Sequence, residues 1–151
     1  MKQTFIKTLL LLFVILTAAA CGDDEKNFGY SAVLPEQAQL FVEQYFPTVE
    51  YASIERGIDD GEIEYEVKLY DGTELEFDEW GEWTSVSNKF AGVPSDILPM
   101  AIAADIATFY PHAVIYKVEK KLGGYEIDIT GWELLYSKQG VLCLLYTSPS
   151  P

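Results

Sequence analysis

The chain of 151 residues contains two similar halves, and this repetition constrains the fold more than any other feature of the sequence. The segment QYFPTVEYASIERG (44–57) returns in the second half as TFYPHAVIYKVEKK (108–121). Further along the chain the offset between matching positions falls from 64 to 60 and then to 59, and both shifts lie beside glycines, as changes in hairpin-loop length would produce. One such unit is too small to bury a core alone, so the repeat predicts two units that share one sheet.

Each half begins with a pattern that predicts a helix. The first helix is predicted over Pro35–Phe46, where four apolar residues share one helical face: Ala38, Phe41, Val42 and Tyr45. The second is predicted over Asp96–Tyr110, with Ser95 as the N-cap and an apolar stripe formed by Ile102, Ile106 and Phe109. Pro47 and Pro111 end the two helices, because the residue before a proline avoids the helical conformation.

Alternating segments follow each helix. In Glu62–Leu69 every second residue is apolar and the residues between are charged, which predicts a strand with one covered face and one open face. Further strands are predicted around Tyr51–Arg56, beyond the Asp71-Gly72 turn, and over Glu82–Val86. The sequence therefore predicts an α+β fold: two tandem α-β-β-β-β repeats forming one antiparallel sheet with both helices on one face. The predicted core includes Tyr65, Val67, Phe77, Tyr125, Ile127 and Leu134.

The N-terminus predicts export. Residues 1–20 combine a basic start, an apolar run shorter than a membrane span and three alanines, which is typical of a signal peptide. Cys21 follows directly and resembles the lipidated cysteine of bacterial lipoproteins, although Ala18 stands where that pattern usually has Leu. Cleavage after Ala20 by an ordinary signal peptidase is the alternative. Residues 21–30 are predicted to be a lipidated acidic tether.

The acidic stretch behind Cys21 resembles the signal that sends lipoproteins of the Bacteroides group to the outer face of the outer membrane. This resemblance implies an outer-membrane, lipid-anchored and surface-exposed protein. A periplasm-facing protein with an acidic spacer is the alternative.

The two halves together resemble a known family. The series LP…YFP…IERG…YEVKLYDGTELEFDEWGEW, followed by ILP…FYP…VEKK…GYEIDITGWELLYSKQG, is similar to the PepSY-like, beta-lactamase-inhibitor-like proteins of Bacteroidetes. The resemblance covers residues 31–142, as repeats 31–91 and 92–142, and implies a secreted, non-enzymatic α+β module. Beta-lactamase inhibitory protein shares the plan but relies on disulfides, for which this chain lacks the cysteines. No inhibitory contact motif is recognisable.

The C-terminus departs from the family pattern. The ending VLCLLYTSPSP resembles translated adapter sequence, so residues 143–151 are predicted to be a non-native or disordered tail. The alternative is a natural last strand over Val141–Tyr146. Cys143, within this segment, therefore carries no functional argument.

Composition and motifs exclude several functions. Without its signal the chain has eight bases against 24 acids, a net charge of −16, which argues against nucleic-acid binding. The single histidine, His112, is predicted to be a solvated loop residue, and no catalytic motif accompanies it. The segments DDGEIE and DGTELEFDE offer oxygens for calcium, but neither has EF-hand spacing and hairpin turns explain both. No enzyme activity, metal or cofactor is predicted.

A binding surface remains as the functional hypothesis. The strand acids fall on outward positions, and two tryptophans occupy predicted turns, which suits a cationic or mixed-charge protein or peptide partner. The partner-binding candidates are Glu64, Glu66, Glu76, Trp80, Glu126 and Trp132. A structural envelope component without a discrete ligand is the alternative, and a hydrolase is a distant third.

Overall fold

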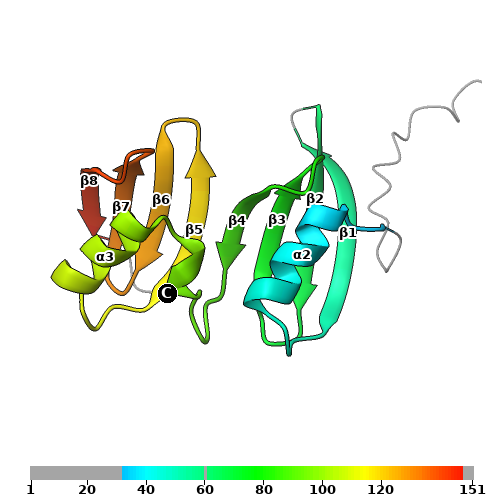
Figure 1. Ribbon diagram of the computed structural model, residues 1–151, viewed down its shortest axis with the longest axis horizontal. Coiled ribbons are helices and arrows are strands. Elements are labelled where there is room, and N and C mark those ends of the chain that lie inside the picture. Colours follow the sequence, from blue (N-terminus) through cyan, green and yellow to red (C-terminus); the bar gives the residue numbers. More distant parts are fainter. Residues whose placement is uncertain (1–31, 60, 148–151) are drawn as a thin grey trace, which may run out of the picture.

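The computed structural model describes residues 32–59 and 61–147, and these form one eight-stranded antiparallel sheet with two α-helices. The elements of the first half are α2 (Glu36–Tyr45), β1 (Tyr51–Asp59), β2 (Glu62–Leu69), β3 (Glu74–Asp78) and β4 (Trp83–Ser87). Those of the second half are the 3-10 helix η1 (Ser95–Ile97), α3 (Met100–Phe109), β5 (Ile115–Lys121), β6 (Gly124–Ile129), β7 (Trp132–Ser137) and β8 (Leu142–Thr147). The strands are neighbours in sequence order (Figure 1). The α+β, single-sheet prediction is confirmed.

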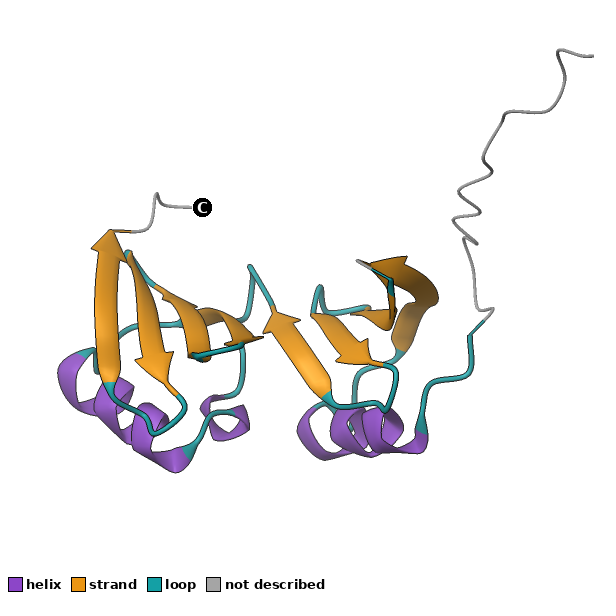
Figure 2. Cartoon of the chain, turned by 90° about the horizontal axis from the view of Figure 1, so that it is seen from above, coloured by secondary structure: helices purple, strands orange, loops and turns teal. Residues whose placement is uncertain are grey.

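Figure 2 shows α2 and α3 on the same side of the strands. The two halves meet where β4 pairs with β5, through the short ladder Ser85↔Glu119, Val86↔Val118 and Ser87↔Lys117. A buried asparagine, Asn88, fixes the chain just after this ladder. Its side-chain amide donates to the hydroxyl of Thr73 at 3.0 Å, and its side-chain oxygen accepts from the backbone N–H groups of Phe90 and Ala91 at 2.9 Å.

One continuous row of apolar residues crosses all the strands. Directly paired residues point to the same face of an antiparallel sheet, and the registers link Ile54, Val67, Leu75, Val86, Val118, Ile127, Leu134 and Leu145 in a single line. The six inner members of this row are fully buried. Ala38 and Val42 of α2 and Ile102 and Ile106 of α3 belong to the same core. The helices therefore cover the face on which this row lies.

The two halves share local details as well as element order. Phe46 and Tyr110, which occupy equivalent positions, each end a helix with an N–H bonded to the carbonyl four residues back, at 2.8 Å in both cases. Asp78 and Ser137, which are also equivalent, each accept a backbone N–H with a side-chain oxygen in a hairpin turn. The following glycines, Gly81 and Gly140, have φ of +86° and +80° and lie against the first turn of α2 and of α3, respectively.

The second helix begins later than the sequence predicted. Ser95 opens the 3-10 helix instead of capping the α-helix, and α3 starts at Met100. Pro99 is the physical reason, because it holds Leu98 in an extended conformation (φ −74°, ψ 150°) that interrupts the helix. Phe109, placed in the buried stripe by its spacing, is 69% exposed at the last turn, so that prediction is wrong.

The predicted core is correct in its main members. Val67, Phe77, Ile127 and Leu134 are fully buried, and Tyr65 and Tyr125 are partly buried against them. None of the helices in the described part of the chain is long and apolar enough to cross a bilayer. The predicted signal peptide, Cys21 and the tether lie outside the described residues, as do residues 148–151. Residues 142–147 form the strand β8. The non-native origin of residues 143–151 stays a prediction.

Candidate functional site: the acidic open face

The face of the sheet opposite the helices is open and acidic. Strand positions that alternate with the buried row point to this side, and no described element covers it (Figure 2). Its directly paired residues include many acid–acid pairs: Glu55↔Glu66, Asp59↔Glu62, Glu64↔Asp78, Glu66↔Glu76, Glu119↔Glu126 and Asp128↔Glu133. Among the paired residues described, Lys68↔Glu74 and Lys117↔Asp128 combine opposite charges on this face. Most of the directly paired charged residues on the open face are therefore pairs of acids.

In the first half of the chain, the pKa values of two acids on the open face are raised. Partial burial, with the charges of Glu76, Asp59 and Glu66, raises the pKa of Glu64. Partial burial, helped by Glu119 and Glu66, also raises the pKa of Glu76, although Lys117 opposes it. Here Glu66 is the acid with a close cation, because Lys68 Nζ lies 2.9 Å from its carboxylate. Of the predicted site residues, Glu64, Glu66 and Glu76 thus form one acidic patch.

In the second half the acids surround two lysines. Lys117 donates to Glu119 at 2.6 Å, and Lys121 contacts both Glu119 and Glu126. Burial acts to raise the pKa of Glu119, but Lys117 and Lys121 outweigh burial and lower this pKa. Burial and the charge of Glu119 raise the pKa of Asp128 against the influence of Lys117. Glu126, predicted as a site residue, therefore belongs to a partly neutralised network, unlike the acidic patch of the first half.

Two acids of the calcium-like segment DGTELEFDE have other partners. Asp71 accepts the backbone N–H of Thr73 at 2.9 Å, and Asp78 accepts those of Trp80 and Glu82 at 3.0 and 2.8 Å. These are the hydrogen bonds of tight turns. Within residues 32–59 and 61–147, no group of three or more His, Cys, Asp or Glu side chains could hold a metal ion. His112 is exposed after the end of α3.

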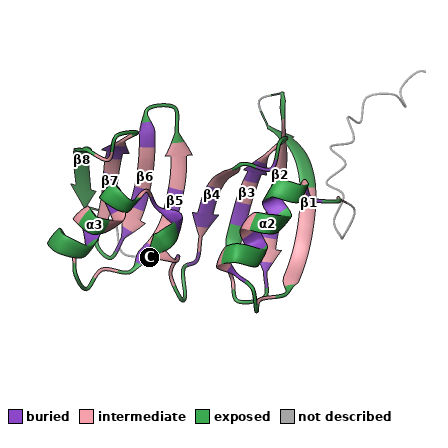
Figure 3. Cartoon of the chain, in the orientation of Figure 1, coloured by how far each residue is buried: buried purple, intermediate pink, exposed green. Residues whose placement is uncertain are grey.

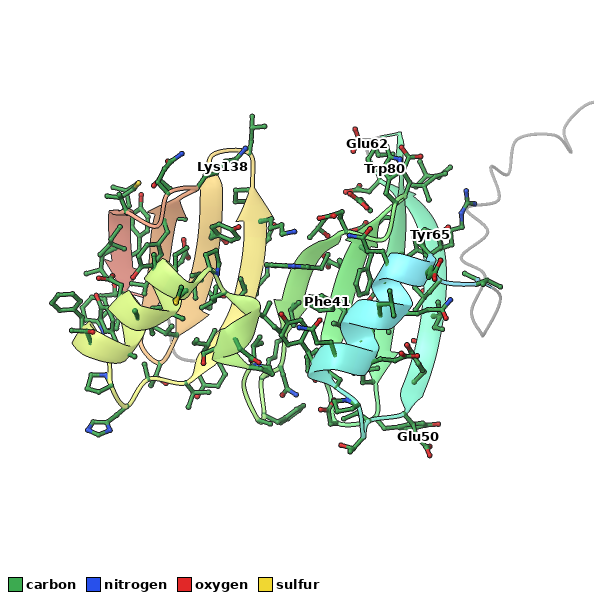
Figure 4. The ribbon with its side chains drawn as sticks, in the orientation of Figure 1. Phe41, Glu50, Glu62, Tyr65, Trp80 and Lys138 are labelled. Carbon is green, nitrogen blue, oxygen red and sulfur yellow. The ribbon has the colours of Figure 1, made fainter. Side chains whose placement is uncertain are left out.

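The first predicted tryptophan is exposed at one end of the sheet. Trp80 is in the turn between β3 and β4, and its side chain is 69% exposed. Figure 4 shows it at the same end of the sheet as Glu62 and Lys138, and at the opposite end from Glu50. The β3–β4 turn thus carries an exposed aromatic ring at this end of the sheet.

The second predicted tryptophan lies on the other side of the sheet. Trp132 is the first residue of β7 and pairs directly with Ile129, which is 2% exposed in the core. The tight turn through Gly131 keeps the two residues on the same face, so Trp132 packs partly buried against the core. The structure therefore does not bring Trp132 together with the four glutamates.

An aromatic cluster that the sequence did not predict lies at the junction of the halves. Phe41 of α2 packs against Trp83 of β4 at 5.9 Å between ring centroids, and Trp83 against Tyr125 of β6 at 6.5 Å. Lys120 Nζ lies 4.2 Å from the centroid of Trp83 and 3.6 Å from the carboxylate of Glu82. These rings are partly buried against the core. The aromatic content of β4 and β6 was visible in the sequence, but their contact depends on the β4–β5 pairing.

These features define a class of protein: a small α+β protein whose single antiparallel sheet is covered by helices on one side and presents acids on the other. The chain belongs to the family described as "Putative beta-lactamase-inhibitor-like, PepSY-like", whose sequence pattern matches residues 63–143. This confirms the family resemblance seen in the sequence. The comparison with curated proteins found no match.

Three solved structures from Bacteroides are similar to this chain. A "putative periplasmic protein" of Bacteroides vulgatus is 34% identical, with a TM-score of 0.72 over 76% of this chain and 91% of that one. A "putative calcium-regulated periplasmic protein" of Bacteroides thetaiotaomicron is 31% identical, with the same TM-score and coverage. A "putative periplasmic protein of unknown function" of B. vulgatus is 32% identical, with a TM-score of 0.71 over 75% and 91% of the two chains. The family and these relatives are described as periplasmic or inhibitor-like, and none of them as an enzyme.

Proposed function

We propose that this chain is a non-enzymatic binding module of the cell envelope, which captures a cationic protein or peptide on the acidic open face of its sheet. The observation that carries the proposal is the set of acid–acid pairs on that face. Like charges directly opposite each other on neighbouring strands destabilise a sheet. A partner that supplies Lys or Arg side chains would relieve this repulsion, and the chain would bind such a partner at the same place.

The contact is proposed to centre on Glu64, Glu66 and Glu76, with Trp80 at its edge. Glu64 is surrounded by other acids and has no cation among the causes of its pKa shift, so it has most to gain from a positive partner. Trp80 supplies exposed aromatic area of the kind that dominates binding energy at protein interfaces. Glu126 is proposed as an outlying contact. An inhibitor of an enzyme and a capturing module for a peptide are both covered by this proposal.

We also propose that the chain arose by tandem duplication of an α-β-β-β-β unit, with both helices on one face, and that Cys21 carries a lipid anchor on the outer membrane. The matched helix ends and hairpin turns support the duplication. Periplasmic relatives support placement in the envelope. Changing Cys21→Ala should release the protein from the membrane fraction, whereas an unchanged membrane fraction would contradict the anchor. A structural component without a discrete ligand remains the competing function.

A charge-matched pair of variants tests the binding proposal. The first combines Glu64→Gln, Glu66→Gln and Glu76→Gln on the open face. The second combines Glu36→Gln, Glu43→Gln and Asp96→Asn, which are exposed residues on the helix side, so that both variants change the net charge equally. Proteins captured from an envelope extract are quantified by mass spectrometry, and each is then titrated against both variants at low and physiological salt. Calcium and a chelator are included as separate conditions, because one relative is described as calcium-regulated.

The face variant is expected to lose the captured partner while the control variant keeps it. Binding of the unsubstituted chain should weaken as salt rises, since exposed charges are screened beyond about 8 Å at physiological ionic strength. If both variants lose the partner equally, the attraction is a general effect of net charge and the site is wrong. If neither loses it, the open face is not the binding surface.

A further inference from the structure

Helix α3 is apolar on its outward side as well as on its buried side. Its sequence, MAIAADIATF, has one charged residue, Asp105, whose carboxylate accepts a hydrogen bond from the Tyr136 hydroxyl at 2.6 Å. Ile102 and Ile106 are buried in the core. Residues three or four apart share a face of a helix, and the outward face of α3 consists of Met100, Ala101, Ala104, Ala107 and Thr108. All five residues are exposed, and Figure 3 colours most of the α3 ribbon as exposed.

The outward face of α3 offers no unpaired side-chain polar group to water. Thr108 Oγ1 donates to the carbonyl oxygen of Ala104 at 2.7 Å, so this hydroxyl needs no partner outside the helix. Met100 is 86% exposed, and methionine is one of the residue types enriched at protein interfaces. A helix that is apolar all round is normally buried all round. The outward face of α3 therefore has the composition of an interface.

The first half of the chain shows that the fold does not require such a face. The residues of α2 at the equivalent positions, 64 residues earlier, are also exposed, and they are Glu36, Gln37, Leu40, Glu43 and Gln44. The two helices have the same length and lie on the same side of the sheet. The same place in the repeat thus carries two acids and two glutamines in α2 and none in α3. The apolar face is a property of the second half alone.

We propose that two copies of this chain associate through the outward faces of α3, with the two helices antiparallel about a two-fold axis near Ala104. Both copies use the same surface, so the association closes as a dimer. The antiparallel arrangement places the N-terminal end of each helix beside the C-terminal end of the other, where the helix dipoles attract. Met100 of one copy then lies against Thr108 of the second copy. Ala104 lies against Ala104, where small side chains let the helix axes approach to about 8 Å.

Charge identifies a second copy as the occupant of this face. The chain is strongly negative, so two copies repel each other wherever their acids meet. The outward face of α3 has no charged residue, whereas the open face and the outward side of α2 carry acids. A cationic partner would find no acid on the outward face of α3. Because α3 lies opposite the open face, the dimer leaves both open faces uncovered, and this inference does not depend on the proposed function.

The dimer is expected to be weak. A helix of ten residues is about 15 Å long, and interfaces below about 1,200 Å² belong to weak or transient complexes. The starting protein for the test carries Cys21→Ala and Cys143→Ser, so that neither a lipid nor the exposed thiol of Cys143 can cause association. Its mass is measured by sedimentation equilibrium from about 10 μM to about 1 mM, the range of weak binding constants.

Ala104→Glu tests the interface, and Leu40→Glu at the equivalent position of α2 is its matched control. Both residues are exposed, and both changes add one negative charge. Ala104→Glu brings like charges together at the two-fold axis and should weaken the dimer at least about tenfold, whereas Leu40→Glu should change its dissociation constant by less than about twofold. Ala104→Lys alone should also weaken the dimer, and an equimolar mixture of the Ala104→Glu and Ala104→Lys proteins should restore association. Circular dichroism checks the fold of each variant.

Disulfide trapping tests the orientation of the helices. A disulfide needs Cα atoms within about 7 Å of each other, and Met100 and Thr108 are separated by about 12 Å along one helix. A mixture of Met100→Cys and Thr108→Cys proteins should therefore form a covalent heterodimer under mild oxidation, whereas Met100→Cys alone should form far less. Alkylation of the Met100→Cys thiol should be fast at about 10 μM and slow near about 1 mM.

Four results would overturn the proposal. A constant monomer mass with fast alkylation at every concentration shows that the face stays uncovered. A constant monomer mass with slow alkylation at every concentration shows that another segment of the same copy covers it. Equal weakening by Ala104→Glu and Leu40→Glu shows that net charge, and not this face, governs association. Efficient trapping of Met100→Cys with itself shows that the helices are not antiparallel.

Discussion

Two glutamates on the open face should respond in opposite ways when their charge is removed. Glu64 has only acids among the charges that shift its pKa, so Glu64→Gln removes repulsion and keeps the side-chain volume. Glu119 accepts hydrogen bonds from Lys117 and Lys121, so Glu119→Gln removes attraction. A like-charge pair across strands is worth about 0.2–1 kcal/mol, and exposed ion pairs are worth about the same. We expect Glu64→Gln to raise the free energy of unfolding by about 0.5 kcal/mol and Glu119→Gln to lower it by about 0.5–1 kcal/mol.

Thermal unfolding followed by circular dichroism at neutral pH and low salt measures both changes. One kcal/mol corresponds to roughly 4–8 °C in a domain of about 100 residues, so Tm should rise by about 2–4 °C for Glu64→Gln and fall by about 2–8 °C for Glu119→Gln. Both differences should shrink in about 1 M salt, where the Debye length falls to about 3 Å. If both variants shift Tm in the same direction, the electrostatic description of the face is wrong.

Three further predictions concern the pH profile, the tryptophans and one glycine. Four acids of the open face have raised pKa values, namely Glu64, Glu76, Asp128 and Glu133, so their protonation favours the folded state and stability should increase as pH falls from about 7 to about 5. The pKa of Glu119 is lowered, so the contribution of Glu119 to stability is lost only below about pH 4.5. A Tm that falls steadily from neutral pH would contradict this pH profile. In urea titrations, Trp132→Ala should lower the free energy of unfolding by about 3 kcal/mol, because the Trp132 ring packs on the core. Trp80→Ala should lower it by less than about 0.5 kcal/mol, because the Trp80 ring is exposed. Equal losses would refute the assigned positions of the two rings. Gly81→Ala should destabilise the protein more than Gly61→Ala. Both glycines have positive φ (+86° and +87°), but an added Cβ at Gly81 would lie 2.8 Å from Pro35 Cβ and 2.9 Å from the backbone nitrogen of Ala38. Similar unfolding midpoints for the two variants would show that α2 does not pack closely against this turn.

The architecture could be predicted because its determinants are local and repeated. The alternation in Glu62–Leu69 assigns each residue to a face of the sheet without knowledge of its neighbours, and β2 has these bounds. The repeat then transfers the same assignment to the second half, where Ile127 and Leu134 are buried as expected. Glu64, Glu66, Glu76 and Glu126 were placed on the open face for the same reason.

The errors arose where geometry over several residues decides the outcome. Trp132 follows a turn, and whether it lies inside or outside depends on the residue with which it pairs across Gly131. Phe109 has the spacing of a buried helical residue, but it lies in the last turn of α3, where it is exposed. The contact of Lys120 with Trp83 joins β5 to β4, which a pattern within one repeat does not determine.

The two faces of the sheet have different effects on stability, because one face holds the buried apolar core and the other holds the repelling acids. The row from Val67 to Leu134 is fully buried on one side, and truncation of such residues to Ala typically costs about 2–5 kcal/mol each. Each acid–acid pair on the other side costs at most about 1 kcal/mol. Because strand residues alternate between the faces, a substitution on the open face changes charge without changing the core. The acidic patch around Glu64 therefore costs only a modest amount of stability, and this repulsion is what the proposed cationic partner would relieve.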